Sequence, residues 1–587
     1  MKILLTAVNA KYIHSNLAVY SLKAYAEKYQ EHIQIAEYTI NHRVEFILRE
    51  IYKQKPDVLC FSCYIWNFRY IQELIVELKK LLPEIPVWVG GPEVTYEPEI
   101  FLEQYPMVTG VMIGEGEAVF QDLCRYYIEG KNEIGLAQIP GLVFRGIQGE
   151  LVRTASREPL CMDQLPFCYH KLEDFTNRII YYETSRGCPF SCSYCLSSIE
   201  KGLRFRSFKL VKQELKFFLD HRVPQVKFVD RTFNCNHEHA VEIWQYLKAH
   251  DNGITNFHFE ISADLLTEEE IALIASMRPG LIQLEIGVQS TFAPAIEEIH
   301  RTMDLSRLRQ VVSCLKQAGT VHQHLDLIAG LPREDFSAFA ESFRQVYAMK
   351  PEQLQLGFLK VLKGSYMYEH QQEYGLLYQE YPPYEVMATN WLTYDEILKI
   401  KLAEEMLEVY YNSGQFEMTM KVLELIEDNP FLLFMHLGEF YESRGLLAMS
   451  HSRIRRCEIL LDYIEEKDPE YRELYQETLT FDLYYRENMK SRPGWAPDLS
   501  EYKDISRQYC KKGKLTHLEP FWYDMEIIQK KETLAEYPEK KKERSFYLFS
   551  YEQRHPLTGQ AGVCMVQHLN GTRDCNARLS DGGKNVR

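Results

Sequence analysis

The sequence lacks the features that would point to a membrane protein or a nucleic-acid-binding protein. No apolar run reaches the roughly 18 residues that a membrane-spanning helix needs, and the opening MKILLTAVNAKY turns polar too soon for a secretory signal peptide. An excess of positive charge is also absent, because 83 acidic residues outnumber 67 Lys and Arg and give a net charge of −16. We therefore expect a cytoplasmic protein with a small-molecule or peptide substrate, and no nucleic-acid partner.

Fourteen cysteines without an export signal favour reduced thiols and metal ligands over a disulfide framework. Three of them, Cys188, Cys192 and Cys195, lie in TSRGCPFSCSYCLSS (184–198) with the spacing C-x3-C-x2-C. A chance cluster is one alternative. A structural zinc site is another, but neither Cys235 nor His221 completes the paired knuckle that closed zinc sites use. Three thiolates on a four-iron cluster would instead leave one iron open to a ligand.

The first 140 residues alternate short apolar runs with amphipathic helical segments. The apolar runs are KILLTAV (2–8), DVLCFSCY (57–64), PVWVGG (86–91) and VTGVMIG (108–114). Such alternation predicts βαβ units and a parallel sheet, so we expect a Rossmann-like α/β domain over residues 1–140. The Gly- and Pro-punctuated stretch 141–177 is expected to be a linker.

A second α/β series follows over residues 178–365. Its six candidate strands are 179–185, 225–230, 257–262, 282–290, 323–330 and 354–361. This number of strands predicts a partial (β/α)6 barrel of the TIM type, in which strand ends and βα loops carry the chemistry. A helical domain is expected over 375–550, beginning near a capping box at Thr393–Glu396. Residues 553–587 lack periodicity and are expected to be a disordered tail.

The cysteine spacing, with Tyr194 before the last cysteine, resembles the signature of radical S-adenosylmethionine (SAM) enzymes. The resemblance extends over the barrel series and implies a [4Fe–4S] cluster held by the three cysteines. In that family the open iron binds the amino and carboxylate groups of SAM, and the reduced cluster cleaves SAM to a 5′-deoxyadenosyl radical. A reductant such as flavodoxin or ferredoxin would supply the electron.

The resemblance also suggests residues that contact SAM, each of which could instead be an ordinary strand-end or packing residue. The stretch FVDRTFN (228–234) replaces the usual Gly-Gly-Glu, and Arg333 follows DLIAGLP where an acidic residue is usual. The predicted contacts are Phe190 and Tyr194 beside the cluster and adenine, Asp230 for the methionine amino group, Glu260 and Ser262 for ribose or carboxylate, Gln289 and Ser290 at the fourth strand end, and Gly330 near adenine.

The N-terminal domain is similar to cobalamin-binding Rossmann-like domains that are fused to radical SAM enzymes. The similarity rests on the loop from Asn9 to Asn16, on Ser62, on Gly90-Gly91 and on Gly114-Glu115-Gly116-Glu117. The D-x-H-x-x-G motif that supplies a histidine to cobalt is absent, and His14 is the one histidine in the corresponding loop. The predicted cobalamin-binding residues are Asn9, His14, Ser62, Gly90, Gly91, Glu115 and Glu117.

Together these resemblances imply a radical enzyme that uses SAM, a [4Fe–4S] cluster and cobalamin, with methyl transfer to an unactivated carbon as the first expectation. Cobalamin-assisted cyclisation or rearrangement, as in anaerobic tetrapyrrole ring formation, is one alternative, and a non-catalytic sensor is another. A tRNA methylthiotransferase is disfavoured because Cys60, Cys63 and Cys124 do not match that family's second cluster motif. The helical C-terminal segment is similar to an uncharacterised domain on a subset of these proteins, and we expect it to shape the substrate entrance.

Overall fold

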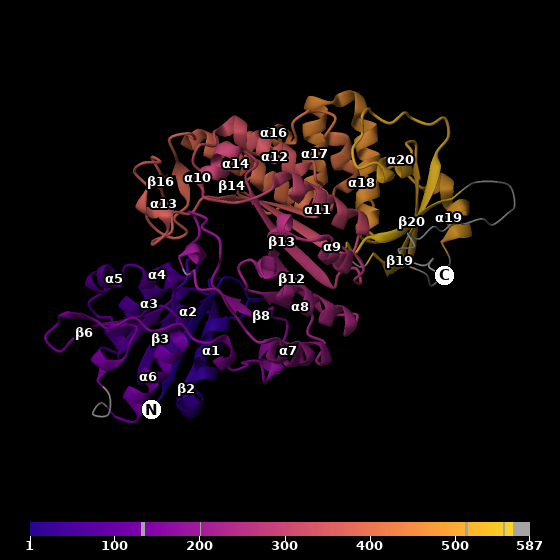
Figure 1. Cartoon of the computed structure of the whole chain (residues 1–587). Coiled ribbons are helices and arrows are strands. Elements are labelled where there is room, and N and C mark those ends of the chain that lie inside the picture. Colours follow the sequence, from indigo (N-terminus) through magenta and orange to yellow (C-terminus); the bar gives the residue numbers. More distant parts are fainter. Residues whose placement is uncertain (131–134, 200, 511–514, 556–557, 567–587) are drawn as a thin grey trace.

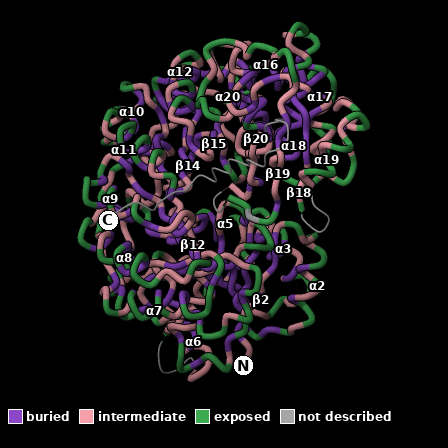
Figure 2. The backbone as a smooth tube through the Cα atoms, turned by 90° about the vertical axis from the view of Figure 1, so that its right-hand side faces the viewer, coloured by how far each residue is buried: buried purple, intermediate pink, exposed green. Residues whose placement is uncertain are grey.

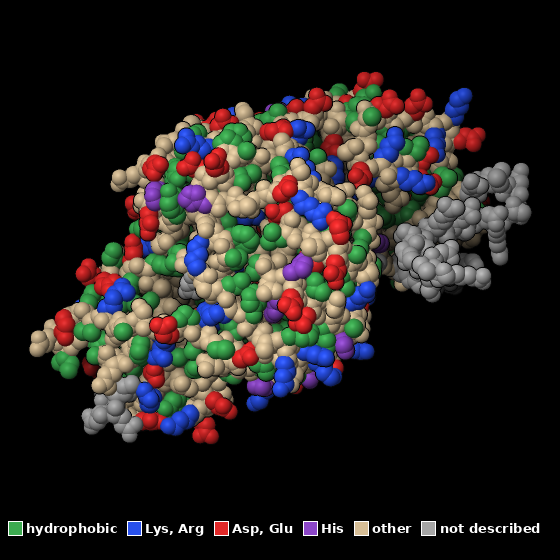
Figure 3. Space-filling model, viewed as in Figure 1, with side chains coloured by type: hydrophobic (Ala, Val, Ile, Leu, Met, Phe, Trp, Pro, Cys, Tyr) green, Lys and Arg blue, Asp and Glu red, His purple; other side chains and the backbone are tan. Residues whose placement is uncertain are grey.

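The computed structural model describes residues 1–587 except 131–134, 200, 511–514, 556–557 and 567–587. Figure 1 shows three regions in chain order: an N-terminal α/β domain, a second parallel sheet with its helices, and a mainly helical C-terminal region. Buried residues gather along the sheets and the inner helix faces, and exposed residues follow the outer helices (Figure 2). On the face drawn in Figure 3, acidic and basic side chains are interspersed. In the described part of the chain, no helix is long and apolar enough to cross a bilayer.

The N-terminal domain is built on a seven-stranded sheet with the order β2-β1-β3-β4-β5-β6-β7. Its first five strands are parallel, and both faces are covered, which explains why β1 and β3 are buried along their whole length. The strands are β1 (Ile3–Asn9), β2 (Ile33–Thr39), β3 (Val58–Ser62), β4 (Val87–Gly90), β5 (Gly110–Met112), β6 (Leu142–Arg145) and β7 (Leu151–Arg153).

Two apolar cores lie on opposite faces of this sheet. One packs against α2 (Val44–Gln54), α3 (Phe68–Leu81) and α5 (Pro98–Gln104), and the other against α1 (Leu17–Tyr25) and α6 (Gly116–Ile128). The short helix α4 (Pro92–Thr95) follows β4. The sheet continues past residue 140 into the predicted linker, because LVFR and LVR pair as an antiparallel hairpin on β5. Sequence reasoning took the glycines around these runs as linker punctuation, but they form the hairpin turn.

The second sheet has the order β15-β14-β13-β12-β11-β8, and all its strands are parallel. This is the predicted six-stranded partial barrel. Among the described residues its edge strands β8 and β15 do not pair with each other, so the barrel has an open side. The strands are β8 (Ile180–Tyr182), β11 (Gln225–Phe228), β12 (Asn256–Ile261), β13 (Ile282–Gln289), β14 (His322–Ala329) and β15 (Gln353–Phe358).

Alternation along β13 and β14 separates an apolar outer face from a polar inner face. Ile282, Leu284, Ile286 and Val288 are buried, while the residues between them are partly accessible. The outer face packs against α7 (Phe208–Asp220), α8 (His237–Ala249), α9 (Glu268–Ala275), α11 (Leu305–Ala318) and α12 (Phe336–Tyr347). We call the space enclosed by the inner face the lumen.

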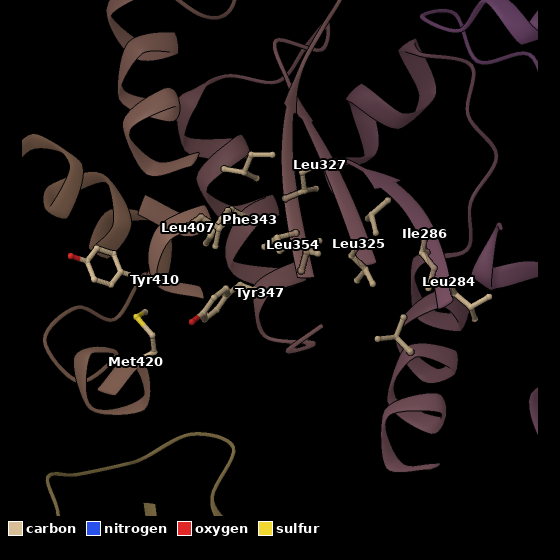
Figure 4. Close-up of a cluster of buried hydrophobic side chains, with 14 of the residues drawn as sticks. Leu284, Ile286, Leu325, Leu327, Phe343, Tyr347, Leu354, Leu407, Tyr410 and Met420 are labelled. Atoms are coloured by element: carbon tan, nitrogen blue, oxygen red, sulfur yellow. The ribbon is translucent and has the colours of Figure 1, made fainter. Parts of the chain in front are cut away.

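The C-terminal region packs on α12 and shares one apolar core with the barrel. Figure 4 shows Leu354 and Leu327 beside Phe343 of α12 and Leu407, and Tyr347 lies 4.9 Å from Tyr411 between ring centroids. Its helices are α13 (Tyr366–Glu369), α14 (Tyr394–Met406), α15 (Glu417–Leu423), α16 (Pro430–Ser443), α17 (Arg453–Lys467), α18 (Arg472–Arg486), α19 (Lys503–Tyr509) and α20 (Met525–Lys530). The predicted capping box is present at the start of α14.

The C-terminal region also contains strands that sequence reasoning missed. A hairpin joins β16 (Leu377–Tyr378) to β17 (Val386–Ala388), and a three-stranded sheet contains β18 (Thr516–Phe521), β19 (Ser545–Arg554) and β20 (Ala561–Val566). The prediction of a disordered tail is therefore wrong for Ala561–Val566, where pairing with β19 supplies the order that local periodicity did not indicate. The prediction is also wrong for Arg554, which ends β19, while 556–557 and 567–587 lie outside the described residues.

Candidate functional site

The three motif cysteines lie on a loop with a closed neck. Strand β9 (Ser185–Arg186) pairs antiparallel with β10 (Arg204–Phe205), so that Arg186 lies opposite Arg204. We call residues 187–203 the cluster loop; residue 200 is outside the described residues. Gly187 has a φ of +91°, and a Cβ atom there would lie 2.7 Å from the carbonyl oxygen of Gly202. The neck therefore requires glycine.

Hydrogen-bond donors surround the cysteine sulfurs. Cys188 and Cys192 are each 8% exposed, and Cys195 is more accessible. Nη1 of Arg301 lies 3.7 Å from Sγ of Cys192, and Nη2 of the same side chain donates to the carbonyl oxygen of Gly287. Burial raises the pKa of Cys188, while a hydrogen bond from Thr232 opposes that rise. A guanidinium and a hydroxyl beside the sulfurs offset part of the cost of burying thiolates, the form that binds metal.

These surroundings fit an iron–sulfur cluster better than a closed zinc site. In the part of the chain that the structure describes, no three His, Cys, Asp or Glu side chains converge on one ion. The thiols instead share one loop at the carboxyl end of β8, where parallel barrels carry their chemistry. Tyr194 packs against the barrel core, and burial raises its pKa. Phe190 is half-buried on the same loop.

Asp230 has protein partners for its carboxylate. It is completely buried and accepts hydrogen bonds from the Thr184 amide (3.1 Å), the Thr184 hydroxyl (2.6 Å) and the Ser185 hydroxyl (2.6 Å). Burying a carboxylate is costly unless donors compensate, and these three donors do so. Asp230 thus supports the strand end that leads into the cluster loop. Its predicted contact with the SAM amino group stays a prediction.

Two further predicted SAM contacts are Glu260 and Gln289. Glu260 lies 3.7 Å from Nζ of Lys227, while Gln289 ends β13 with a φ of +70° and a buried Oε1 that has no hydrogen-bond partner. The remaining three are Ser262, Ser290 and Gly330, which hydrogen-bond with or pack against the protein. The hydroxyls of Ser262 and Ser290 donate to Asp264 (2.7 Å) and Glu334 (2.6 Å), and a Cβ atom on Gly330 would meet Val386 at 2.6 Å.

Sequence reasoning missed an ionisable wall inside the lumen. The carboxylate of Glu285 lies 2.9 Å from both Nζ of Lys227 and Nε2 of His258. Burial opposes ionisation of Glu285, but His258 and Lys227 lower its pKa to about 2. On β14, His324 Nε2 and Asp326 Oδ1 are buried and lie 3.2 Å apart, so the two side chains pair with each other. The alternation in IQLEIGVQ and HQHLDLIA was a signal that could have placed these residues on the inner face.

Burial raises the pKa of Asp326 to about 8, and the nearby charges of Glu285 and Glu260 act in the same direction. A neutral carboxyl group at this position can donate a hydrogen bond at neutral pH. Buried polar atoms without partners are rare in native proteins, so each one deserves an explanation. Gln289 Oε1 is such an atom on the same inner wall, and a polar ligand in the lumen would satisfy it.

The predicted cobalamin-binding residues lie mainly at the carboxyl edge of the N-terminal sheet. Asn16 donates to the Ser62 hydroxyl at 3.4 Å, and Asn9 donates to Glu37 at 2.9 Å. Gly91 has a φ of +114°, and a Cβ atom there would lie 2.4 Å from the carbonyl oxygen of Cys63. The turns after β3 and β4 therefore approach each other closely at the carboxyl edge of the sheet, where open α/β sheets bind ligands. Gly90 precedes this turn at the end of β4.

Two aromatic residues on the loop after Ser62 were not predicted. The rings of Tyr64 and Trp66 stack with centroids 4.5 Å apart and an angle of 6°, and Trp66 is 41% exposed. Trp66 Nε1 donates to the carbonyl oxygen of Val8, which fixes the indole at the sheet edge. A flat and partly exposed aromatic pair offers a surface for a large planar ligand. The aromatic spacing in SCYIWN was the available signal.

His14, Glu115 and Glu117 contact the barrel. His14 forms a β-bridge with Ile179, and its Nδ1 hydrogen-bonds with the Tyr181 hydroxyl, while burial lowers its pKa. Glu115 and Glu117 pair with Arg204 and Arg186 at the neck of the cluster loop. In this geometry the three side chains have protein partners. Their contacts with cobalamin stay a prediction.

The N-terminal domain lies across the open side of the barrel and contacts both of its edges. Beside β8, the Ser15 hydroxyl donates to the carbonyl oxygen of Ile179 at 3.0 Å. Beyond β15, the Tyr384 hydroxyl donates to Glu93 at 2.8 Å, and Nζ of Lys363 lies 2.8 Å from Glu97. The carboxyl edge of the N-terminal sheet therefore faces the open side of the lumen (Figure 1).

Comparisons with known families agree with this three-part architecture. The B12 binding domain family matches residues 3–124, and the radical SAM superfamily matches residues 182–346. A family described as a protein of unknown function (DUF4080) matches residues 372–552.

Curated relatives include methyltransferases and cyclases. The chain is 24% identical over 418 residues to the uncharacterized methyltransferase PH0819 of Pyrococcus horikoshii, covering 69% of this chain and 87% of the relative. It is 28% identical to the cobalamin-dependent radical SAM methyltransferase TokK of Streptomyces tokunonensis, covering 49% and 44%. It is 21% identical to the anaerobic magnesium-protoporphyrin IX monomethyl ester cyclase of Rubrivivax gelatinosus, covering 51% and 55%. The chain thus spans about half the length of the last two relatives.

Solved structures support the fold. The radical SAM methyltransferase TsrM from Kitasatospora setae, with cobalamin and a [4Fe–4S] cluster bound, superposes with a TM-score of 0.51 at 16% identity, covering 70% of this chain and 80% of that one. The cobalamin-dependent radical SAM enzyme OxsB, with aqua-cobalamin and SAM bound, gives a TM-score of 0.56 at 16% identity, covering 82% and 78%.

The family matches and the geometry agree on the cofactors. They are a [4Fe–4S] cluster and SAM in the radical SAM domain, and cobalamin in the B12-binding domain. The non-catalytic sensor alternative receives no support, because the named relatives are enzymes. With B12-binding and radical SAM domains followed by a DUF4080 region, the chain belongs to the cobalamin-dependent radical SAM enzymes.

Proposed function

We propose that the protein is a methyltransferase that transfers a methyl group to an unactivated carbon of a polar small molecule or peptide held in the lumen. The observation that carries this proposal is that the two predicted cofactor sites face the same open side of the barrel. The cluster loop lies at the carboxyl end of β8, and the carboxyl edge of the cobalamin domain lies across the open side between β8 and β15. A substrate in the lumen would be within reach of both cofactors.

The bound cofactors supply the radical and methyl-transfer chemistry, and the chain positions them. Cys188, Cys192 and Cys195 would hold the cluster, while Arg301 donates toward Cys192. The stacked Tyr64 and Trp66 would lie against the corrin ring of cobalamin. The N-terminal domain contacts both edges of the open side, which would limit the access of water and oxygen to reactive species. A small reductant protein such as flavodoxin or ferredoxin would deliver electrons.

The lumen wall supports a polar substrate. Lys227, Glu285 and His258 form one hydrogen-bonded group, and His324 pairs with Asp326 at 3.2 Å. A hydrocarbon in this space would leave the buried Oε1 of Gln289 unsatisfied at a cost of about 1–3 kcal/mol. A substrate with hydroxyl, amide or carboxylate groups can pair with these side chains.

The start of the DUF4080 region supports a role in substrate entry. A cavity of about 380 Å³ lies between the chain beyond β15 and the β16–β17 hairpin. Its lining combines aromatic rings with two charged side chains: Val361, Lys363, Tyr368, Leu376, Leu377, Tyr378, Glu380 and Tyr384. Its size suits a small ligand, and we propose it as the approach to the lumen.

The test is a labelling experiment that does not need the substrate. The reconstituted protein is reduced anaerobically with cobalamin and with SAM that carries a deuterated methyl group. A methyltransferase is expected to move the label into the cobalamin fraction and to release S-adenosylhomocysteine, both detectable by mass spectrometry. A cyclase or a rearrangement enzyme, the alternative that the Rubrivivax relative supports, would form 5′-deoxyadenosine without either product. That outcome would contradict methyl transfer.

A further inference from the structure

The neck of the cluster loop is held by a carboxylate from the cobalamin-binding domain. Nη2 of Arg204 donates to Oε1 of Glu115, and Nη1 of Arg186 lies 3.3 Å from Oε2 of the same side chain. Glu117 adds a second carboxylate, 2.5 Å from Nη2 of Arg186. We call these four residues the neck clamp.

The clamp, together with Glu183, whose carboxylate lies 3.0 Å from Nε of Arg186, offsets an electrostatic conflict in the hairpin. Arg186 and Arg204 lie directly opposite each other on β9 and β10, and like charges in that arrangement destabilise a strand pair. Burial opposes ionisation of Glu115, yet the two guanidiniums hold its pKa below the usual range. The side chains of Glu115 and Arg186 are each 16% exposed, so their attraction is less screened than that of a surface ion pair.

The carboxylates come from a turn that also borders the cobalamin edge. Glu115 is the N-cap residue of α6 and Glu117 lies in the first turn of that helix, after β5, at the carboxyl end of the parallel strands where open α/β sheets bind ligands. The Ser21 hydroxyl of α1 donates to Glu117 at 3.1 Å, which ties the turn to the helix after the Asn9–Asn16 loop. One turn therefore contacts both the neck of the cluster loop and the edge that faces cobalamin.

We infer that Glu115 and Glu117 are positioning residues that couple the two cofactor sites, so that loading of the cluster tightens cobalamin binding and cobalamin stabilises the cluster. The coupling must be reciprocal, because linkage between two binding equilibria has one free energy. Ordering the cluster loop fixes both arginines, and these fix the turn beside cobalamin. The inference concerns cofactor binding alone and stands whether the enzyme transfers methyl groups or closes rings.

The test compares hydroxocobalamin binding by cluster-free and cluster-loaded protein under anaerobic conditions, with iron content and circular dichroism checked in each sample. For the wild-type chain we expect cluster loading to lower the Kd by a factor within the usual range of about 5–150. In Glu115→Gln, which keeps the shape but removes the charge, this ratio should fall toward one, whatever the change in the absolute Kd. Glu99→Gln is the matched control, because it removes a carboxylate paired with Arg153 within the same domain.

The reciprocal measurement follows iron release to a chelator with and without hydroxocobalamin. Cobalamin should slow release in the wild type and in Glu99→Gln, but not in Glu115→Gln. If Glu115→Gln fails to fold, Arg204→Gln gives the same comparison from the barrel side of the clamp. Equal Kd values for cluster-free and cluster-loaded wild-type protein would overturn the inference, as would full coupling in a folded Glu115→Gln variant. Neither result bears on the products of the labelling experiment.

Discussion

Single side chains in the lumen illustrate how the fold changes the properties of ordinary residues. Asp326 is one of the alternating inner-face residues of β14, and burial raises its pKa to about 8. In the unfolded chain its pKa would be about 3.9. At a pH between about 3.9 and 8, the Asp326 carboxyl group therefore keeps a proton in the folded state that it releases in the unfolded state. Stability contributed by this proton is therefore present at low pH and is lost as the pH rises toward 8.

Asp326→Asn should remove this pH dependence, because the amide cannot ionise. Near pH 4 the variant and the wild type should have similar free energies of unfolding. At pH 8 the variant should be more stable by about 2 kcal/mol, after allowance for partial hydration of the carboxylate. Urea unfolding of cofactor-free protein at the two pH values measures the difference. A stability difference that stays constant between pH 4 and pH 8 would contradict the raised pKa.

Cys188, Cys192 and Cys195 were recognisable from sequence because three thiols in eight positions are rare by chance. The ionisable wall was harder to see, since Glu285 and His324 are 39 positions apart and become neighbours only through the pairing of β13 with β14. Glu115 and Glu117 were predicted to contact cobalamin, but their arginine partners lie about 70–90 residues away. No local pattern could have indicated those pairs.

Among the elements, the turn from β4 into α4 carries a strict steric requirement. Gly91 has a φ of +114° and a ψ of 174°, and a Cβ atom at this position would lie only 2.4 Å from the Cys63 carbonyl oxygen. That backbone region is essentially restricted to glycine. The pairing of turns from two neighbouring strands therefore depends on this residue.

Gly91→Ala should destabilise the protein by about 2–4 kcal/mol, from backbone strain and from displacement of the loop after β3. It should also weaken hydroxocobalamin binding at least tenfold, because the displaced loop carries Tyr64 and Trp66. Gly149→Ala is the control, since Gly149 has a φ of +89° but no atom within 4 Å of its Cβ position. Thermal unfolding and a cobalamin titration measure both effects. Equal cobalamin affinity in the two variants would contradict this account of the turn.

The main helices and strands were predictable because their apolar runs have clear periods, as in the six strands of the barrel. The parallel strand β2, β20 and the β6–β7 hairpin were missed, because strands at a sheet edge depend on pairing with residues elsewhere in the chain. Local sequence therefore predicted the barrel and the central strands of the N-terminal sheet well, and the outer strands of that sheet poorly.

At the scale of the whole molecule, the arrangement of the domains builds the site. The N-terminal domain contacts the barrel beside β8 through Ser15 and beyond β15 through Glu93 and Glu97. This placement brings the two cofactor domains together at the open side of the barrel. Sequence comparison could indicate the domains but not their contact, because the contact joins polar residues more than 160 positions apart.

The central claim is that the three cysteines hold a cluster that cleaves SAM by radical chemistry. The most direct measurement is mass spectrometry of the nucleosides formed from SAM by anaerobically reconstituted, reduced protein with cobalamin, beside Cys192→Ala. The account predicts 5′-deoxyadenosine from the wild-type protein and only background from the variant, whose iron loading should also be lost. Equal 5′-deoxyadenosine formation by Cys192→Ala, or full cluster absorbance in that variant, would contradict it.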